Sequence, residues 1–262
     1  MKGLYAVYRK EMSHYFVSPV AYIIVGVFLI LTAYFFNRLL VVLIQQSMQV
    51  ALQAGEEGGA APFDVPSLLM RNFFGIASTL LLFITPMLTM GVYAEERRRG
   101  TMELLMTSPI TDVAIVLGKF LASLTLLVIM LVPTAISFAY MMLHSEPAAS
   151  WRLLFSDYLG VLLLGGSLLA LGCFFSSLTE SQLIAAVLTF GGILLLWVVD
   201  FGAASSSTTL SSALQYLSAF SHYSDFTRGV IDTSSVIFYL SFMFLGIFLT
   251  VRSVESMRWR RA

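Results

Sequence analysis

Apolar residues are grouped along the chain into six long runs, which shorter polar segments separate. A helix needs about 20 mostly apolar residues to span a bilayer, and the runs have about that length or more. They cover residues 17–36, 73–93, 113–143, 158–178, 183–199 and 234–251. Strands of a membrane β-barrel alternate apolar and polar residues over about ten positions, whereas these runs are apolar throughout. The pattern predicts an all-α integral membrane protein, a six-transmembrane-helix bundle.

The basic residues divide unequally between the two sides of this bundle. With the N-terminus inside, the inside segments carry Lys2, Arg9, Lys10, Arg97, Arg98, Arg99, Lys119, Arg252, Arg258, Arg260 and Arg261. The outside segments carry only Arg38, Arg71, Arg152 and Arg228. Because Lys and Arg are enriched on the cytoplasmic side, both termini are predicted to be cytoplasmic.

Residues 1–16 predict an amphipathic interfacial helix ahead of the transmembrane domain, residues 17–262. Its apolar positions recur at helical spacing, with Arg9, Lys10 and Ser13 on the other side. The candidate interface residues are Tyr8, Arg9, Lys10, Glu11 and Met12. An ordinary positive flank of the first span is the alternative. A cleaved signal peptide is not favoured, because the apolar run ends at Phe36 and Asn37 rather than at small residues.

Composition supports the membrane class. Hydrophobic residues make up 58% and charged residues 11% of the 262 positions, whereas soluble domains have roughly 25% charged residues. The net charge is +0, which gives no indication of a nucleic-acid partner. The one cysteine, Cys173, cannot form an internal disulfide. These values exclude a soluble enzyme, a disulfide-framed secreted module and a nucleic-acid binder.

Two outside segments are long. Residues 39–72 predict a helical extension of the first span followed by a turn at Gly55–Gly59. In residues 201–232, a Ser/Thr-rich run precedes residues 213–220, which are apolar enough to re-enter the membrane edge. A solvated loop and a functional cap both remain open for this second segment.

The inside loop between the second and third runs predicts a docking helix at residues 100–108. Gly100 can end the helix that leaves the membrane, Thr101 can cap the next one, and Pro109 lies where that helix must end. An apolar face on such a loop suits a groove on a cytoplasmic protein. The candidate residues are Glu95, Glu96, Arg97, Arg98, Gly100, Thr101, Met102, Glu103, Leu104, Leu105, Met106 and Pro109.

Within the apolar runs, ionisable residues are almost absent. Lys119 lies near the start of the third run, where it can extend toward the interface. A metalloprotease pair is missing from the sequence, and Ser167 has no nearby general base, so an intramembrane enzyme is disfavoured. The glycines of the fourth run predict close helix packing rather than a substrate path. They are Gly160, Gly165, Gly166 and Gly172.

Several motifs resemble the ABC-2-type transporter permeases. One is the Glu-Glu-Arg-Arg-x-Gly-Thr-x-Glu-Leu-Leu motif at residues 95–105, followed by Val-Leu-Gly-Lys-Phe at 116–120. Arg-Lys-Glu at 9–11, Ser-Pro-Val-Ala-Tyr at 18–22 and Ile-Thr-Pro-Met-Leu-Thr-Met at 84–90 resemble the gliding-motility-associated branch. The similarity covers the first half of the chain and the six-helix layout.

This resemblance implies a permease subunit in the bacterial inner membrane, with residues 100–108 as the coupling helix. It implies two copies of a separate cytoplasmic ATPase, and this ATPase binds ATP and Mg²⁺. It also implies a second permease protomer and allows an auxiliary periplasmic or membrane subunit. The chain itself lacks a P-loop, since Gly118-Lys119 is followed by Phe120. The inside connection 176–182 is expected to be a minor ATPase contact or a plain connector. An ATP-powered scaffold on envelope machinery is the alternative function, and the substrate is not indicated.

The six-span topology makes a direct prediction. We expect a reporter fused after Ala262 to be cytoplasmic and one inserted at Gly58 to be periplasmic, because an odd number of spans separates these positions. Paired alkaline phosphatase and fluorescent-protein fusions measure the two sides. If both reporters are found on one side, the six-span arrangement is wrong.

Overall fold

The computed structural model describes residues 2–57, 64–102, 110–144, 150–204 and 218–259. Every regular element in these ranges is a helix, which confirms the predicted all-α fold. In chain order they are α1 (Lys2–Val17), α2 (Pro19–Glu57), α3 (Val65–Thr89), α4 (Ala94–Arg98), α6 (Asp112–His144), α7 (Trp151–Leu178), α8 (Gln182–Ala204), α10 (Ala219–Phe226) and α11 (Thr233–Trp259). Six of them are long and apolar enough to cross a membrane.

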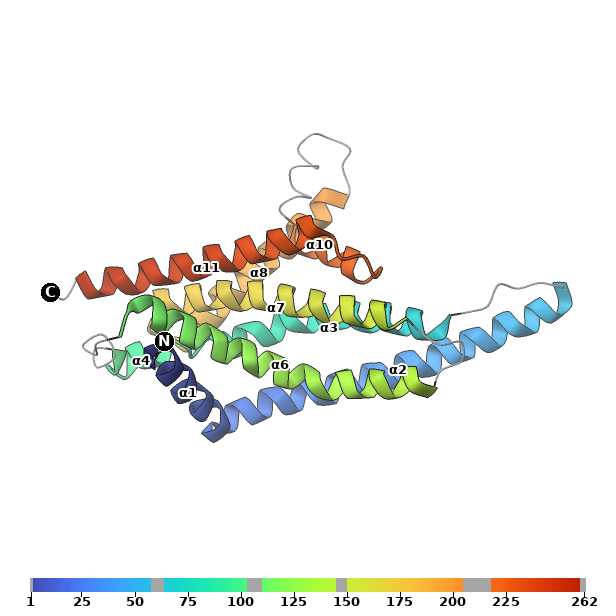
Figure 1. Cartoon of the computed structure of the whole chain (residues 1–262), viewed down its shortest axis with the longest axis horizontal. Coiled ribbons are helices and arrows are strands. Elements are labelled where there is room, and N and C mark those ends of the chain that lie inside the picture. The colour runs from blue at the N-terminus through green and yellow to red at the C-terminus, as the bar shows by residue number, and fades with distance from the viewer. Residues whose placement is uncertain (1, 58–63, 103–109, 145–149, 205–217, 260–262) are drawn as a thin grey trace.

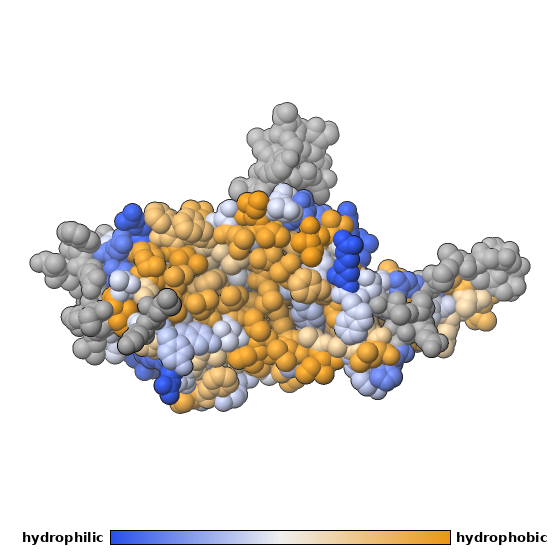
Figure 2. Space-filling view, viewed as in Figure 1, coloured by the Kyte–Doolittle hydropathy of each residue, from blue (hydrophilic) through white to orange (hydrophobic). Residues whose placement is uncertain are grey.

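The long helices lie side by side along the longest axis of the molecule (Figure 1). The start of α1 and the last turns of α11 are at the same end of the bundle, which we call the N/C end. Apolar residues cover the middle of the visible face, and hydrophilic residues gather toward both ends (Figure 2). This arrangement is that of a multi-pass membrane protein.

The helix ends differ from the predicted ones where local signals extend them. α2 has 39 residues, about 58 Å at 1.5 Å per residue, so the predicted extension of the first span is confirmed. α3 begins at Val65 instead of residue 73, because the Asp64 side chain caps it by accepting a hydrogen bond from Ser67 N at 3.2 Å. Pro66, in the first turn, suits a helix start.

Helix α7 is at the centre of the bundle and contacts α3, α6, α8, α10 and α11. Its glycines allow these close approaches. A Cβ added at Gly160 would lie 2.7 Å from Phe226 Cβ, and one at Gly165 would lie 2.5 Å from Leu127 Cδ2. Similar overlaps arise at Gly166 with Met243 and at Gly172 with Thr89. The predicted packing role of these glycines is confirmed.

The short helix α10 packs into the end of the bundle opposite the N/C end. Tyr223 is 4% exposed, and its hydroxyl donates to Phe74 O at 2.9 Å. The Ser156 hydroxyl donates to Phe226 O at 2.9 Å, which ties α10 to α7. This part of the second long outside segment is therefore not a solvated loop. Residues 205–217, which include most of the segment predicted to re-enter the membrane, lie outside the described residues.

An unexpected carboxyl group lies beside α10. Asp157, in the second turn of α7, is 0% exposed, and neither of its oxygens has a hydrogen-bond partner among the described residues. The sequence predicts the fourth span from residue 158, which leaves Asp157 just outside it. That placement was wrong, because α7 begins at Trp151 and carries Asp157 into the packed interior.

The lack of a partner predicts that the charge at Asp157 does not stabilise the fold. Burying an unpaired carboxylate costs several kcal/mol, so we expect Asp157→Asn to leave the melting temperature unchanged or to raise it. Thermal unfolding of the detergent-solubilised protein measures this. A fall of more than about 4 °C, roughly 1 kcal/mol or more for a chain of this size, would show that the carboxylate has a stabilising partner.

Candidate functional site

The sequence-predicted loop begins at the N/C end, where α3 gives way to α4. Residues 90–93 form a turn, and a hydroxyl at the end of α7 fixes its backbone. Ser176 Oγ accepts from Tyr93 N at 3.1 Å and Ala94 N at 3.3 Å, and donates to Met90 O at 3.1 Å. The turn is therefore attached to the central helix by a side chain that is itself 0% exposed.

A buried lysine joins this turn to two other helices. Lys119 of α6 is 1% exposed, and its Nζ donates to Glu11 Oε1 of α1 at 2.9 Å and to Val92 O at 2.8 Å. Its ion-pair distance to Glu96 Oε2 of α4 is 3.0 Å. Lys10 Nζ lies 2.6 Å from Glu96 Oε1 and completes the group. We call Lys10, Glu11, Glu96 and Lys119 the charge cluster.

The charge cluster balances two cations against two carboxylates, and three of its side chains are largely shielded from water while Lys10 is 57% exposed. The Tyr93 ring, 5.3 Å from Lys119 Nζ, adds a cation–π contact. Partial burial lowers the pKa of Lys10, but its contacts with Glu96 and Glu11 outweigh this effect, so the pKa lies above its ordinary value. Removing one member of a buried group leaves the others unpaired, so the cluster holds α1, α4 and α6 in one arrangement.

Helix α1 packs along α6 beside this cluster. Val7 is 3% exposed, and a Cβ added at Gly118 would lie 2.9 Å from Val7 Cβ, so the two backbones approach closely. Tyr8 donates to Thr125 Oγ1 at 3.2 Å. The predicted helix is present, but Glu11, 7% exposed, lies on its buried face. The expected extension of Lys119 toward the interface is wrong, because Lys119 finds its partners inside the bundle.

Two further charged residues of α4, Glu95 and Arg97, contact the connection between α7 and α8. Arg97 Nη1 donates to Ser177 O at 2.8 Å, and its Nη2 lies 3.3 Å from Glu180 Oε1. Gln182 Nε2 donates to Glu95 Oε2 at 3.2 Å. Segment 176–182, which the sequence left as a minor contact or a plain connector, is thus a contact surface for α4.

Past α4 the structure describes only the start of the predicted docking helix. Gly100 has a φ of +70°, which confirms its place as the residue that ends the preceding helix. Met102, one of the predicted docking residues, is 4% exposed and packs with Val92, Tyr93 and Val254 instead of facing outward. This side chain anchors the loop to its own bundle. Glu103, Leu104, Leu105, Met106 and Pro109 lie outside the described residues.

A model of the family described as "ABC-2 family transporter protein" matches residues 5–253, nearly the whole chain. The chain belongs to this ABC-2 family. No curated protein matches the sequence closely. Membership makes this ABC-2 protein a transmembrane permease subunit of an ABC transporter, which associates with the membrane and with an ABC ATPase.

Part of this site is predictable from the sequence of the ABC-2 protein. Glu95, Glu96 and Arg97 are among the predicted coupling residues, and the structure brings them against α1, α6 and the 176–182 connection. Lys119 is not predicted as their partner, although a lysine flanked by apolar residues is a usable signal. Arg9 and Arg98, two other selected residues, form no ion pair with any residue in the described ranges.

The charge cluster of the ABC-2 protein predicts a specific pattern of stabilities. We expect Lys119→Met to lower the free energy of unfolding by about 3–5 kcal/mol, because two shielded carboxylates lose their main cation. Adding Glu11→Gln and Glu96→Gln to this variant should restore most of the loss. Unfolding in detergent mixtures, followed by tryptophan fluorescence, measures all variants.

The matched control is Lys10→Met, whose side chain is 57% exposed. Because an exposed pair contributes little, its loss should cost about 1 kcal/mol or less. Equal effects of Lys119→Met and Lys10→Met would contradict a dominant role for the buried lysine.

Proposed function

We propose that the chain couples ATP hydrolysis by two copies of a cytoplasmic ATPase to export across the bacterial inner membrane. In this proposal the N/C end faces the cytoplasm, and residues 100–108 dock into the ATPase as the coupling helix. Six spans are half of the usual complement for such a transporter, so two permease protomers assemble, most simply as a homodimer. An auxiliary periplasmic or membrane subunit can join them.

The observation that supports the proposal is the attachment of the predicted loop to three parts of the bundle. The loop leaves α4, and α4 is tied to α6 and α1 through the charge cluster and to α7 through Arg97 and Ser177. A displacement of the loop by a partner therefore acts on several helices at once. Export needs two bundle states that bind the ATPase differently, and this attachment gives the partner a way to favour one of them.

In this proposal ATP and Mg²⁺ are bound by the ATPase, and the chain holds no cofactor of its own. The interfacial residues Tyr8, Arg9, Lys10, Glu11 and Met12 keep α1 at the membrane surface, where Lys10 and Glu11 also belong to the charge cluster. Segments 9–11, 18–22 and 84–90 resemble the gliding-motility-associated permeases, and this resemblance supports placing the chain in that branch of the family.

An ATP-powered scaffold that works on envelope machinery is the second candidate. The long α2, which projects past the other helices at the end opposite the N/C end, favours it, because such an extension can reach an envelope partner (Figure 1). Reconstitution with the ATPase separates the two: substrate-stimulated hydrolysis with measurable flux supports export, and hydrolysis without flux supports the scaffold.

The docking role of the coupling helix is tested with Leu105→Asp. A carboxylate placed in an apolar groove costs several kcal/mol, so we expect the ATPase to be lost from the purified complex. The measurement is the amount of ATPase that co-purifies, divided by the amount of permease in the membrane.

The control is Leu143→Asp, which makes the same change at the far end of α6, where Leu143 is 72% exposed. This variant should retain the ATPase. If Leu105→Asp retains as much ATPase as the unmodified chain, residues 100–108 are not the main coupling surface.

A further inference from the structure

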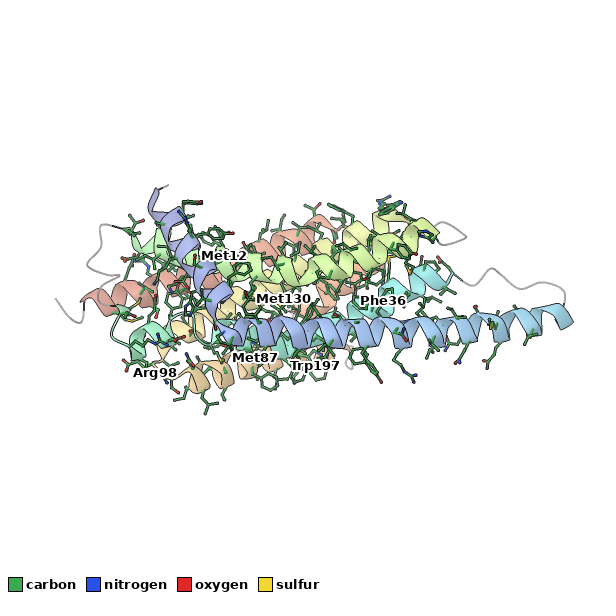
Figure 3. The ribbon with its side chains drawn as sticks, turned by 90° about the horizontal axis from the view of Figure 1, so that it is seen from below. Met12, Phe36, Met87, Arg98, Met130 and Trp197 are labelled. Atoms are coloured by element: carbon green, nitrogen blue, oxygen red, sulfur yellow. The ribbon has the colours of Figure 1, made fainter. Side chains whose placement is uncertain are left out.

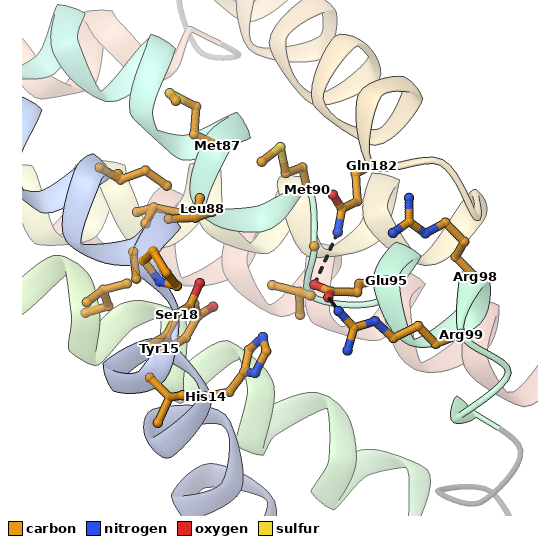
Figure 4. Close-up of a pocket in the computed structure, with 18 residues that line it drawn as sticks. His14, Tyr15, Ser18, Met87, Leu88, Met90, Glu95, Arg98, Arg99 and Gln182 are labelled. Atoms are coloured by element: carbon orange, nitrogen blue, oxygen red, sulfur yellow. Dashed lines mark hydrogen bonds and ion pairs between the residues drawn. The ribbon is translucent and has the colours of Figure 1, made fainter.

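A cavity of about 470 Å³ opens at the N/C end beside the turn (Figure 4). The corner between α1 and α2 forms one wall, and the start of α8 together with α4 forms the other. The end of α3 lies between them, because α3 packs against both α2 and α8. Both sides of the cavity are tied to α4, since Lys10 of α1 pairs with Glu96 and Gln182 of α8 donates to Glu95.

The deeper lining of this cavity is apolar. Ile24 and Leu88 are each 4% exposed, and Met87, which precedes Leu88 on α3 and is 46% exposed, lines the outer part (Figures 3 and 4). On the α2 side, Val17 and Val20 line the cavity while remaining 81% and 49% exposed. In a membrane-spanning bundle, such side chains face lipid, so the cavity is continuous with the lipid-facing surface of α2.

The rim of the cavity is polar and has spare hydrogen-bond donors. Glu95 is already satisfied by Arg99 and by Gln182, so its negative charge is compensated (Figure 4). Arg98 and the His14 ring also line the cavity, and neither side chain has a hydrogen bond or ion pair with any described residue. The guanidinium of Arg98 is therefore a positive charge without an ion-pair partner among the described residues, and it lies beside an apolar floor.

From this combination we infer that the cavity binds a phospholipid with an anionic headgroup. The phosphate lies at the rim beside Arg98, and the upper part of one acyl chain lies over Ile24, Met87 and Leu88. Helix α2 starts at Pro19 and α3 ends at Thr89, so the rim is at the depth where headgroups meet the helix ends. The volume is in the range of small-molecule pockets, about 300–1,000 Å³, and accommodates a headgroup with part of one chain.

This lipid would bridge the α1–α2 corner and α4. The inference goes beyond the proposed coupling function and is tested separately from it, because binding is measured on the permease without any ATPase. Failure of ATPase docking would leave the lipid site untouched, and failure of lipid binding would leave the docking result untouched.

The experiment uses phosphatidylglycerol with a photoactivatable group near the start of one acyl chain. The full-length protein is labelled in phosphatidylcholine nanodiscs, and the labelled peptides are mapped by mass spectrometry. We expect labelling at Met87–Gly91. The variant Arg98→Gln should reduce that labelling about fivefold, as expected for the loss of one charge near an anionic headgroup.

The matched control is Arg38→Gln, which removes one exposed arginine from α2 away from the cavity and should leave labelling unchanged. A steric variant, Gly91→Leu, tests the site without changing charge. A Cβ at Gly91 would lie 3.4 Å from Glu95 Oε2, so a leucine there extends among the lining residues and should block labelling.

Three outcomes would overturn the inference. One is equal labelling of the unmodified chain, Arg98→Gln and Gly91→Leu. Another is equal labelling by a diacylglycerol probe that lacks the phosphate. The third is loss of labelling in excess inorganic phosphate at constant ionic strength, which would assign the rim to free phosphate instead of a lipid.

Discussion

The buried ammonium group of Lys119 is the constraint on which the N/C end depends. A lysine that is 1% exposed must find acceptors inside the protein, and Lys119 finds them on three separate elements: Glu11, Glu96 and Val92 O. Because the cost of leaving these charges unpaired is several kcal/mol, α1, α4 and the turn cannot separate from α6 one at a time. The close approach at Gly118, which has no side chain, makes this geometry reachable.

The cavity follows from this attachment. The charge cluster fixes α1 on α6, and the short link at Ser18 then sets where α2 begins. On the other side, Ser176 and Arg97 hold α4 and its turn against the end of α7. These two fixed bodies leave a space over the end of α3. This space is the cavity. Its floor is apolar because membrane-spanning helices end there, and its rim is basic because the charged loop begins at the same level.

Sequence alone could predict the spans, because a run of about 20 apolar residues has the length and composition of a transmembrane helix. It could also predict that Gly100 ends a helix, because glycine readily adopts the positive φ found after helix C-termini. It could not predict the partners of Lys119, because Glu11 and Glu96 lie far from it in sequence and meet it only through tertiary packing. Met102 belongs to the predicted docking segment, yet it fills the apolar cluster around Val92 and Tyr93. Periodicity shows which residues share a face, but not what covers that face.

Differences in packing indicate where the bundle can change shape. Helix α7 meets α3, α6, α10 and α11 at glycines where even a methyl group would overlap, so these helices resist relative movement. On α2, the Phe36 ring packs edge-on against Phe73 of α3 and Phe138 of α6 at centroid distances of 6.1 and 5.1 Å. At Gly26 no atom lies within 4 Å of an added Cβ. At this glycine α2 can therefore shift without such an overlap, and α2 is the helix that both α1 and the cavity border.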